Sequence, residues 1–375
     1  MAVIYFHIPF CKKRCYYCDF YTSINLKNKD KLITCLAKEL NLRPNYLPDK
    51  SIDTIYFGGG TPSFLSSEEI RYLIEAVSKH YMIVKDAEIT LEANPDDITP
   101  EYLKNLVFTG INRLSLGVQS IFDEDLKFLN RRHSASQGIS AIEMAYYYGF
   151  KNISIDLIYG LPTLTNSKWL ECTKTILDLP IKHLSAYHLT YEPGTVLYNW
   201  LKKGKIKEIN EDESCNQYEI LCQITQEKNF IQYEISNFGL MGYFSKHNCS
   251  YWNGTHYLGI GPSAHSYNGE RRQWNVSNNQ QYIEALDNNK LNFNIEKLNE
   301  KDKHNDFIIT SLRAMWGLNL NELENKFGYN SRLRIEKKAI NYINSNLAKY
   351  QESNIILTKK GMFLSDSIIS DFLII

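Results

Sequence analysis

Short apolar runs alternate with longer amphipathic stretches through the first 230 residues of this 375-residue chain. Nearly continuous apolar runs are typical of strands buried on both faces of a parallel sheet. The runs lie at residues 3–8, 52–57, 87–92, 113–116, 153–158 and 183–189, and helical patterns lie near residues 28–46, 66–82, 100–109, 136–149 and 166–179. Six strand–helix units predict an α/β fold with right-handed crossovers, and six units make a partial barrel rather than a closed eight-stranded one.

Two of the helical patterns begin with recognisable start signals. Ser66 and Glu69 have the spacing of a capping box, in which each side chain bonds the backbone of the other residue. Thr99 offers an N-cap, and Pro100 follows it at the first helical position. We therefore expect helices to begin at these two places.

The pattern changes after residue 230, and we divide the chain into residues 1–230, 231–300 and 301–375. The middle segment is rich in Gly, Asn and aromatic residues in its first part. The last segment has three helical patterns up to residue 346, and residues 354–364 are expected to form a small hairpin, which together predict a winged-helix-like module. Residues 301–360 hold 11 Lys and Arg against 6 Asp and Glu. DNA binding and a solvated structural role both stay open there, and we favour the structural role.

The charge balance and the apolar content limit the functions of the whole chain. Lys and Arg number 42, as do Asp and Glu, so the formal net charge is zero. A protein whose main task is to hold nucleic-acid phosphate or an acidic membrane needs a basic excess, so we expect no nucleic-acid partner. We find no targeting segment and no run of 18 apolar residues, and we expect a cytoplasmic protein in a reducing compartment.

Distinctive motifs follow the ends of all six predicted strands, where functional residues of such folds gather. The first is Cys-x3-Cys-x2-Cys, formed by Cys11, Cys15 and Cys18. Three thiolates on one short loop can hold three irons of an iron–sulfur cube and leave the fourth iron open. A zinc loop completed by a distant histidine, or buried structural cysteines, are the alternatives, but zinc usually takes a second Cys-x2-Cys pair, which we do not find here.

The cysteine loop after the first strand, with Tyr17 before its last cysteine, resembles that of the radical S-adenosylmethionine (SAM) superfamily. This resemblance implies a [4Fe–4S] cluster on Cys11, Cys15 and Cys18. It also implies that SAM chelates the open iron through its amino and carboxylate groups and is cleaved there to a 5′-deoxyadenosyl radical.

The resemblance assigns a SAM pocket to residues at the other strand ends. In the GGGTPS turn, Gly59, Gly60 and Thr61 would contact the methionine part of SAM, since glycines let a backbone approach a small zwitterion. Without the resemblance, the GGGTPS sequence would indicate only a tight turn. Arg131 would pair with the SAM carboxylate, although Arg132 beside it is an alternative. The remaining predicted contacts are Tyr5, facing the cofactor, Glu92 and Gln119 at two strand ends, and Asp156 at the ribose hydroxyls.

A longer match, from YFHIPFC through GLP to GIGPSAH, resembles the branch that contains oxygen-independent coproporphyrinogen III oxidases and HemW-type heme chaperones. The oxidases extend the cluster motif to a fourth cysteine, whereas Asp19 and Phe20 follow here. They also carry a long segment before the first strand. Residues 247–252 read HNCSYW and match the HNxxYW motif associated with heme in the chaperones. This match makes His247 the predicted heme ligand, with Cys249 as the alternative and His256 and His265 as weaker candidates.

The resemblance therefore implies a heme chaperone that delivers heme to recipient hemoproteins, among them membrane-associated ones, and that forms a homodimer. Oxidative decarboxylation of a porphyrinogen propionate is the alternative function. The remaining cysteines are expected to be inert: Cys215 and Cys222 share a helical pattern, and Cys35 and Cys172 lie in similar ones.

Overall fold

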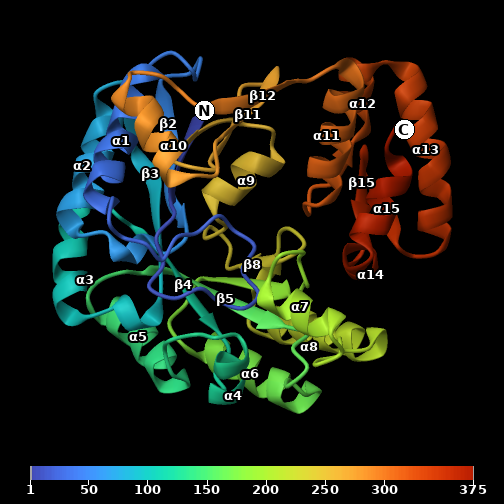
Figure 1. Ribbon diagram of the computed structural model, residues 1–375. Coiled ribbons are helices and arrows are strands. Elements are labelled where there is room, and N and C mark those ends of the chain that lie inside the picture. The colour runs from blue at the N-terminus through green and yellow to red at the C-terminus, as the bar shows by residue number, and fades with distance from the viewer. Residues whose placement is uncertain (1, 375) are drawn as a thin grey trace.

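The computed structural model describes residues 2–374, and its centre is a sheet that contains all six predicted strands (Figure 1). These strands are β1 (Ala2–Ile8), β2 (Ser51–Gly59), β3 (Met82–Ala93), β4 (Arg113–Gln119), β5 (Asn152–Tyr159) and β6 (His183–His188). They are parallel and lie side by side in chain order. The carboxyl ends of six strands therefore meet along one edge, where the predicted motifs lie.

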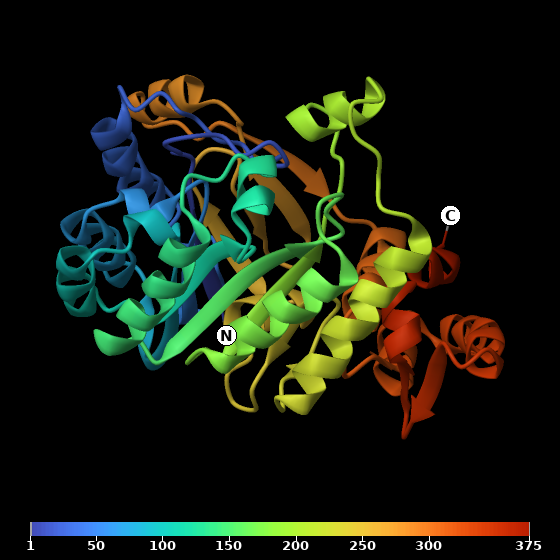
Figure 2. The same cartoon turned by 90° about the horizontal axis from the view of Figure 1, so that it is seen from below.

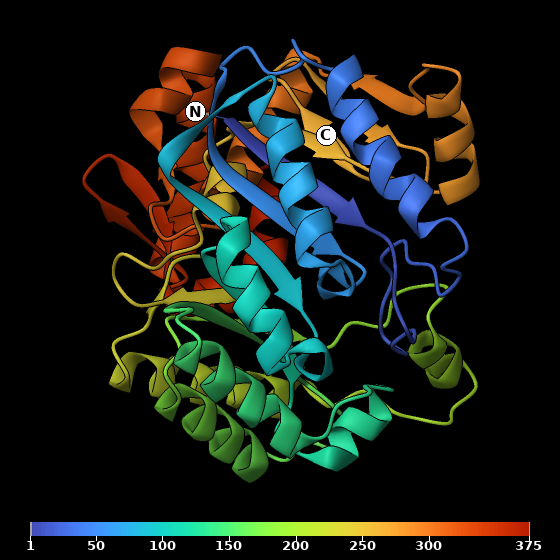
Figure 3. The ribbon, with the colours of Figure 1, turned by 90° about the vertical axis from the view of Figure 1, so that its left-hand side faces the viewer.

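Helices connect the parallel strands and cover one face of the sheet, as Figure 3 shows for α1 to α3. The predicted helices are α1 (Lys29–Leu42), α2 (Ser67–Ser78), α3 (Pro100–Leu106), α5 (Ala135–Tyr147) and α6 (Asn166–Asp178). Both predicted start signals are confirmed: Ser66 and Glu69 form the capping box of α2, and Thr99 caps α3 with Pro100 in its first turn. The short helices α4 (Asp123–Phe128) and α7 (Val196–Lys202) and the long α8 (Glu211–Glu227) complete this part. None of the described helices is long and apolar enough to cross a membrane.

The six strands are largely buried on both faces, as we expected, but only one of the two faces is apolar. In β1, Ile4, Phe6 and Ile8 belong to the core beneath the helices, whereas Tyr5 and His7 alternate with them and face the other side. The other five strands repeat this alternation. Their polar residues on the second face are Thr54, Tyr56, Glu88, Thr90, Glu92, Arg113, Ser115, Ser154, Asp156, His183 and Ser185. The sheet therefore encloses a polar interior opposite its helices.

Residues 231–300 supply strands to both edges of the same sheet. Strand β8 (Asn237–Gly239) pairs with β6, and β7 (Ile231–Gln232) lies outside β8. At the other edge, β9 (His256–Ile260) pairs in parallel with β1. Three antiparallel strands continue from β9 and bring this sheet to twelve strands within the described residues: β10 (His265–Tyr267), β11 (Arg271–Asn275) and β12 (Phe293–Lys297). This segment also forms helices α9 (Lys246–Trp252) and α10 (Asn279–Asp287).

The C-terminal residues form a small module with a core of its own, set apart from α1 to α3 across the sheet (Figures 1 and 2). Its three helices lie where we predicted them: α11 (Glu300–Leu312), α12 (Leu320–Phe327) and α13 (Tyr329–Asn344). The hairpin predicted at residues 354–364 was placed too late. It joins β14 (Ala348–Gln351) to β15 (Asn354–Leu357), and the short β13 (Leu318–Asn319) adds a third antiparallel strand. Helices α14 (Lys359–Phe363) and α15 (Ser365–Phe372) end the described chain.

Candidate functional site

The three motif cysteines lie on the loop that follows β1, and all three are free and half-buried. Backbone hydrogen bonds hold this loop, from the Cys11 N–H to the Ser23 carbonyl at 3.0 Å and from the Tyr16 N–H to the Leu129 carbonyl at 3.1 Å. Burial raises the pKa of Cys11, and it raises the pKa of Cys18 to about 12. Thiolates at these positions therefore need a nearby positive charge, as a metal centre or a cation provides.

Arg131 connects the cysteine loop to the neighbouring strand ends. Its guanidinium donates to Cys15 Sγ at 3.4 Å, to the Asn94 side-chain oxygen at 2.6 Å and to the Gly117 carbonyl at 2.6 Å. Arg132 turns away and pairs with Asp96 and with Asp97. Of the two arginines considered, Arg131 is thus the one whose side chain donates to a cysteine of the loop.

The glycine turn after β2 packs directly against the end of β1. A Cβ atom on Gly60 would lie 2.7 Å from the Phe10 carbonyl oxygen and 2.8 Å from that of Ile8, so only glycine fits there. Gly59 has a φ of +106°, which also favours glycine. Thr61 donates its hydroxyl to Cys11 Sγ at 3.5 Å. The turn therefore places its backbone and the Thr61 hydroxyl beside the cysteine loop.

Glu92 lies beneath this turn, half-buried and near a second carboxyl group, that of Asp156. It accepts hydrogen bonds from the Tyr56 hydroxyl at 2.8 Å and from the Gly59 N–H at 3.2 Å. Burial raises the pKa of Glu92 to about 7, and the nearby carboxylate of Asp156 adds to the shift. Ser115 donates to Asp156 at 3.2 Å, and burial raises the pKa of Asp156 as well. Two half-buried acids so close together are poised to bind hydroxyl or ammonium groups.

Tyr5 and Gln119 complete the set that the structure brings together. The Tyr5 ring lies 6.1 Å from the ring of Tyr56, and its hydroxyl is 3.2 Å from His7 Nδ1. Gln119 has a φ of +68°, which turns the end of β4. A Cβ atom on Gly117 would lie 3.0 Å from the Gln119 amide nitrogen and 3.1 Å from Arg131, so these two side chains are neighbours. All predicted SAM contacts therefore lie at the carboxyl end of the polar interior.

His247 lies deeper in the same interior, on helix α9, with its ring 6.4 Å from that of Tyr5. Its ring is buried, with Nδ1 2.5 Å from the Thr54 hydroxyl and Nε2 3.0 Å from the Tyr251 hydroxyl, and it stacks on Tyr56 at 4.8 Å. Burial lowers its pKa to about 3, with Arg113 contributing. Both ring nitrogens are engaged within the protein, so the neutral imidazole helps fix α9 in this structure.

The other candidates for heme ligation differ in position. Cys249 is half-buried on α9, and burial raises its pKa to about 12, which disfavours the thiolate. His256 lies at the start of β9, with its ring 6.0 Å from that of Tyr267, and the exposed His265 stacks on Trp274. These side chains are distributed over several elements and do not converge on a single point.

Comparison with known proteins places the chain in a family. The Radical SAM superfamily model matches residues 5–176. Heme chaperone HemW of Lactococcus lactis is 34% identical over 99% of this chain and 97% of its own, and that of Bacillus subtilis is 33% identical over 100% and 99%. The chain belongs to the HemW family of radical SAM proteins. The solved structure of the coproporphyrinogen III oxidase HemN from Escherichia coli has a TM-score of 0.84 at 24% identity, covering 99% of this chain and 89% of that one. This similarity shows that the two chains share a fold.

Three residues of this HemW-family chain lie at the site although the sequence analysis assigned them no role. Asn94 donates to the Thr61 hydroxyl at 3.2 Å and accepts from Arg131, so it joins the glycine turn to the arginine. His7 bonds the Tyr21 carbonyl at 2.9 Å and so braces the cysteine loop. Glu88 accepts hydrogen bonds from backbone N–H groups at the start of α9. Asn94 lies two residues after Glu92 at a strand end, and this position was the available signal.

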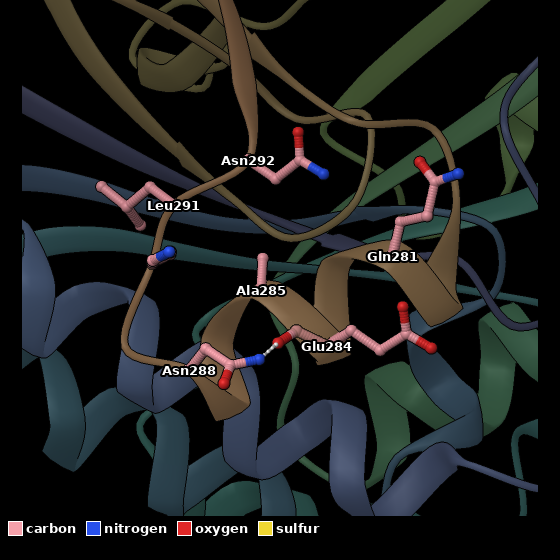
Figure 4. A pocket seen from close by; sticks show the side chains of 7 residues that line it. Gln281, Glu284, Ala285, Asn288, Leu291 and Asn292 are labelled. Carbon is pink, nitrogen blue, oxygen red and sulfur yellow. Dashed lines mark hydrogen bonds between the residues drawn. The ribbon is translucent and has the colours of Figure 1, made fainter.

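Two cavities lie outside the site of this HemW-family chain. Figure 4 shows the smaller, of about 390 Å³, on α10 and the loop after it, where Asn288 donates its amide to the Glu284 carbonyl at 2.8 Å. Among its lining residues only Glu284 and Lys290 are charged, so it offers no set of converging groups. The larger encloses about 970 Å³ between α9, the β9–β11 strands and the C-terminal module.

Proposed function

We propose that this protein binds heme and delivers it to recipient hemoproteins, membrane-associated ones among them. The observation that carries the proposal is the similarity over the whole chain to proteins named heme chaperone HemW, at 33–34% identity. We further propose a cytosolic location and a homodimer.

The cysteine loop supports a resident [4Fe–4S] cluster on Cys11, Cys15 and Cys18, with SAM beside it. In the described residues, no three His, Cys, Asp or Glu side chains stand close enough to hold one metal ion. A cube separates its thiolate ligands because each binds a different iron, whereas a zinc ion gathers its ligands around one centre. Arg131 and the Thr61 hydroxyl would stabilise the thiolates through the contacts described above. When bound, the cluster supplies an electron to SAM.

The SAM contacts follow from the same geometry. Gly60 and Thr61 would hold the methionine part, Arg131 its carboxylate, and Asp156 the ribose hydroxyls. Glu92 already accepts the Gly59 N–H, so its part is to shape the turn as much as to meet the ligand. Tyr5 and Gln119 would close the pocket from β1 and β4.

Each of the three segments of the chain would have a different role. Residues 1–230 form a partial (βα)6 barrel for the cluster and SAM, residues 231–300 carry the HNxxYW helix, and residues 301–375 form a winged-helix-like module without a nucleic-acid partner. Our prediction for His247 is that its replacement weakens heme binding. As an iron ligand it would first have to give up its hydrogen bonds to Thr54 and Tyr251.

The test is an anaerobic titration of the cluster-reconstituted protein with ferric heme, followed by mixing with an apo-hemoprotein. We expect stoichiometric heme binding and transfer of the heme absorbance to the recipient. A parallel assay with coproporphyrinogen III and SAM tests the alternative function. Vinyl formation without heme transfer would establish an oxidase instead. If the protein showed neither activity, both functions would be contradicted.

A further inference from the structure

The larger cavity is a cleft whose floor is a strip of sheet and whose opposite wall is the C-terminal module. Its floor includes Tyr257, Tyr267 and Arg272, and α11 and α12 contribute residues to the far wall. Helix α9 closes one end with the last two residues of the HNxxYW motif. At about 970 Å³, the cleft lies at the upper end of the range for ligand sites, roughly 300–1,000 Å³.

Aromatic rings gather in this cleft. Tyr251 lies edge-on to Tyr257 at 4.9 Å, and Tyr257 lies 5.8 Å from Tyr267. The lining aromatic residues include Tyr251, Trp252, Tyr257, Tyr267, Phe307 and Trp316. Such rings cover a flat conjugated ligand well, because they combine large apolar area with stacking or edge contacts. The buried indole N–H of Trp252 has no hydrogen-bond partner within residues 2–374 and is free to donate to a ligand.

The strand register places three of these residues in a row. Tyr257 on β9 is directly opposite Tyr267 on β10, and Tyr267 is opposite Arg272 on β11. Directly opposed residues on neighbouring strands point to the same face. The two phenols and the guanidinium therefore share the floor of the cleft.

The lining residues limit what could bind an iron there. Among those described, none is His, Cys or Met, so tyrosine is the remaining type that is known to ligate heme iron. The Tyr251 hydroxyl is engaged with His247, whereas those of Tyr257 and Tyr267 make no hydrogen bond within the described chain. Of these two, Tyr257 lies at the centre of the aromatic floor, between Tyr251 and Tyr267.

Charged residues around the cleft suit an anionic porphyrin edge. Arg272 pairs with Asp306, Lys303 with Glu300 at 3.0 Å, and Lys326 with Glu322 at 2.8 Å. The two lysine pairs are exposed and contribute little, so propionates can exchange for the carboxylates of Glu300 and Glu322 at small cost. The cations then lie at the rim and the aromatic rings at the floor.

We propose that ferric heme binds in this cleft with the Tyr257 hydroxyl as the axial ligand, and that His247 is a positioning residue which fixes α9 at the end of the site. This proposal rests on the heme-binding function proposed above. Ligation forms one iron–oxygen bond and releases the phenol proton to solvent, while the iron stays ferric. The guanidinium of Arg272 would offset the phenolate charge.

The test compares Tyr257→Phe with its matched control Tyr267→Phe, which removes the same group one strand away. Both cluster-reconstituted variants are titrated anaerobically with hemin. We expect Tyr257→Phe to lose the charge-transfer band of a phenolate-ligated ferric heme and to bind about tenfold more weakly, a difference of about 1.4 kcal/mol. Tyr267→Phe should keep the band, and both should keep the cluster absorbance. An unchanged spectrum in Tyr257→Phe, or loss of the band in Tyr267→Phe alone, would overturn the assignment.

Two further variants distinguish binding of the porphyrin in the cleft from ligation of its iron by Tyr257. Thr310→Trp puts bulk into the cleft from α11 and should abolish binding of both hemin and metal-free protoporphyrin, whereas Tyr257→Phe should leave the metal-free porphyrin bound. His247→Ala should weaken hemin binding and keep the phenolate band. Loss of an imidazole-type spectrum in His247→Ala would overturn our proposal and leave the proposed function standing. A wild-type protein that binds no heme would overturn both.

Discussion

At the scale of single residues, the half-buried carboxyl of Glu92 makes the stability of the fold depend on pH. Burial holds its pKa near 7 in the folded protein, against an ordinary value of 4.5, so the folded state keeps a proton that the unfolded chain loses. Stability therefore falls as the pH rises from about 4.5 through 7, and the penalty is complete above 7. Below about 4.5 both states are protonated and the residue contributes no pH dependence.

The substitution Glu92→Gln should thus stabilise the fold in alkaline solution only. At 1.36 kcal/mol for each pKa unit, and after subtraction of about 1 kcal/mol for the lost Gly59 hydrogen bond, we expect a gain of roughly 2 kcal/mol at pH 8. At pH 4.5 the variant should be no more stable than wild type. Urea unfolding at the two pH values measures both, and an equal effect at both would contradict a raised pKa.

Arg131 is the second residue whose role can be isolated. Arg131→Lys keeps the charge but loses the planar fork that bonds Cys15, Asn94 and Gly117 together. Because a hydrogen bond to a charged group contributes about 1.5–3 kcal/mol, SAM should bind roughly tenfold more weakly or worse. Equilibrium dialysis of SAM against cluster-loaded protein measures this. Arg132→Lys is the control and should bind SAM like wild type, since Arg132 is held by Asp96 and Asp97.

At the scale of elements, helix α9 is held by a carboxylate from the sheet. Glu88 accepts the backbone N–H groups of Lys246 at 3.2 Å and His247 at 3.1 Å, and it faces the buried guanidinium of Arg113 at 3.9 Å. A negative group at a helix N-terminus is stabilised by the free N–H groups there. The seven-residue helix depends on this anchor because it is too short to be stable alone.

Glu88→Gln should therefore destabilise the protein by roughly 2–3 kcal/mol, through the loss of charge beside Arg113 and the helix start. Urea unfolding measures this loss. Ser66→Ala is the control, since it removes an ordinary capping hydrogen bond from α2, and it should cost about 1 kcal/mol. If the two variants lost equal stability, Glu88 would be no more than a helix cap.

Sequence reasoning succeeded where local pattern decides the structure, as in the capping box of α2 and the six strands. It missed α9 because a seven-residue helix has too few turns to show a period. It did not anticipate that one of the two buried faces is polar, because Tyr, Ala and Leu blur the alternation in runs such as residues 183–189, although His183 and Ser185 face the polar interior. The edge strands β9–β12 depend on pairing between distant segments, which no local pattern specifies.

For the site, the motifs identified the residues that the structure then brought together at the strand ends. The choice between Arg131 and Arg132 was open in the sequence because neighbouring residues have the same chemistry. In the structure, Asp96 and Asp97 in the turn after β3 pair with Arg132 and leave Arg131 to the cysteine loop. The engagement of both His247 nitrogens was also invisible in the sequence, since Thr54 lies 193 residues away. Side-chain partners across the sheet are a property of the folded chain.

At the scale of the whole molecule, the cysteine loop and the aromatic cleft lie toward opposite ends of the sheet. Tyr257 pairs with Val3 near the start of β1, whereas Cys11 follows the end of β1. The six residues from Val3 to Ile8 span about 16 Å of strand, and the polar interior with His247 lies beside them. In the described residues, Cys11, Cys15 and Cys18 are not among the residues that line the cleft.

We therefore expect heme binding and cluster assembly to be independent at equilibrium. Cys15→Ala should remove the brown absorbance of the cluster, because a cube held by two loop cysteines lacks its third protein ligand. The same variant, and wild type from which a chelator has removed the iron, should bind hemin with a dissociation constant within about twofold of the loaded protein, a difference below roughly 0.5 kcal/mol. Hemin titration of all three samples under nitrogen measures this. A tenfold loss of heme affinity in the variant and the chelated protein alike would mean that the cluster organises the cleft across the sheet, and the loop and the cleft would then form one site.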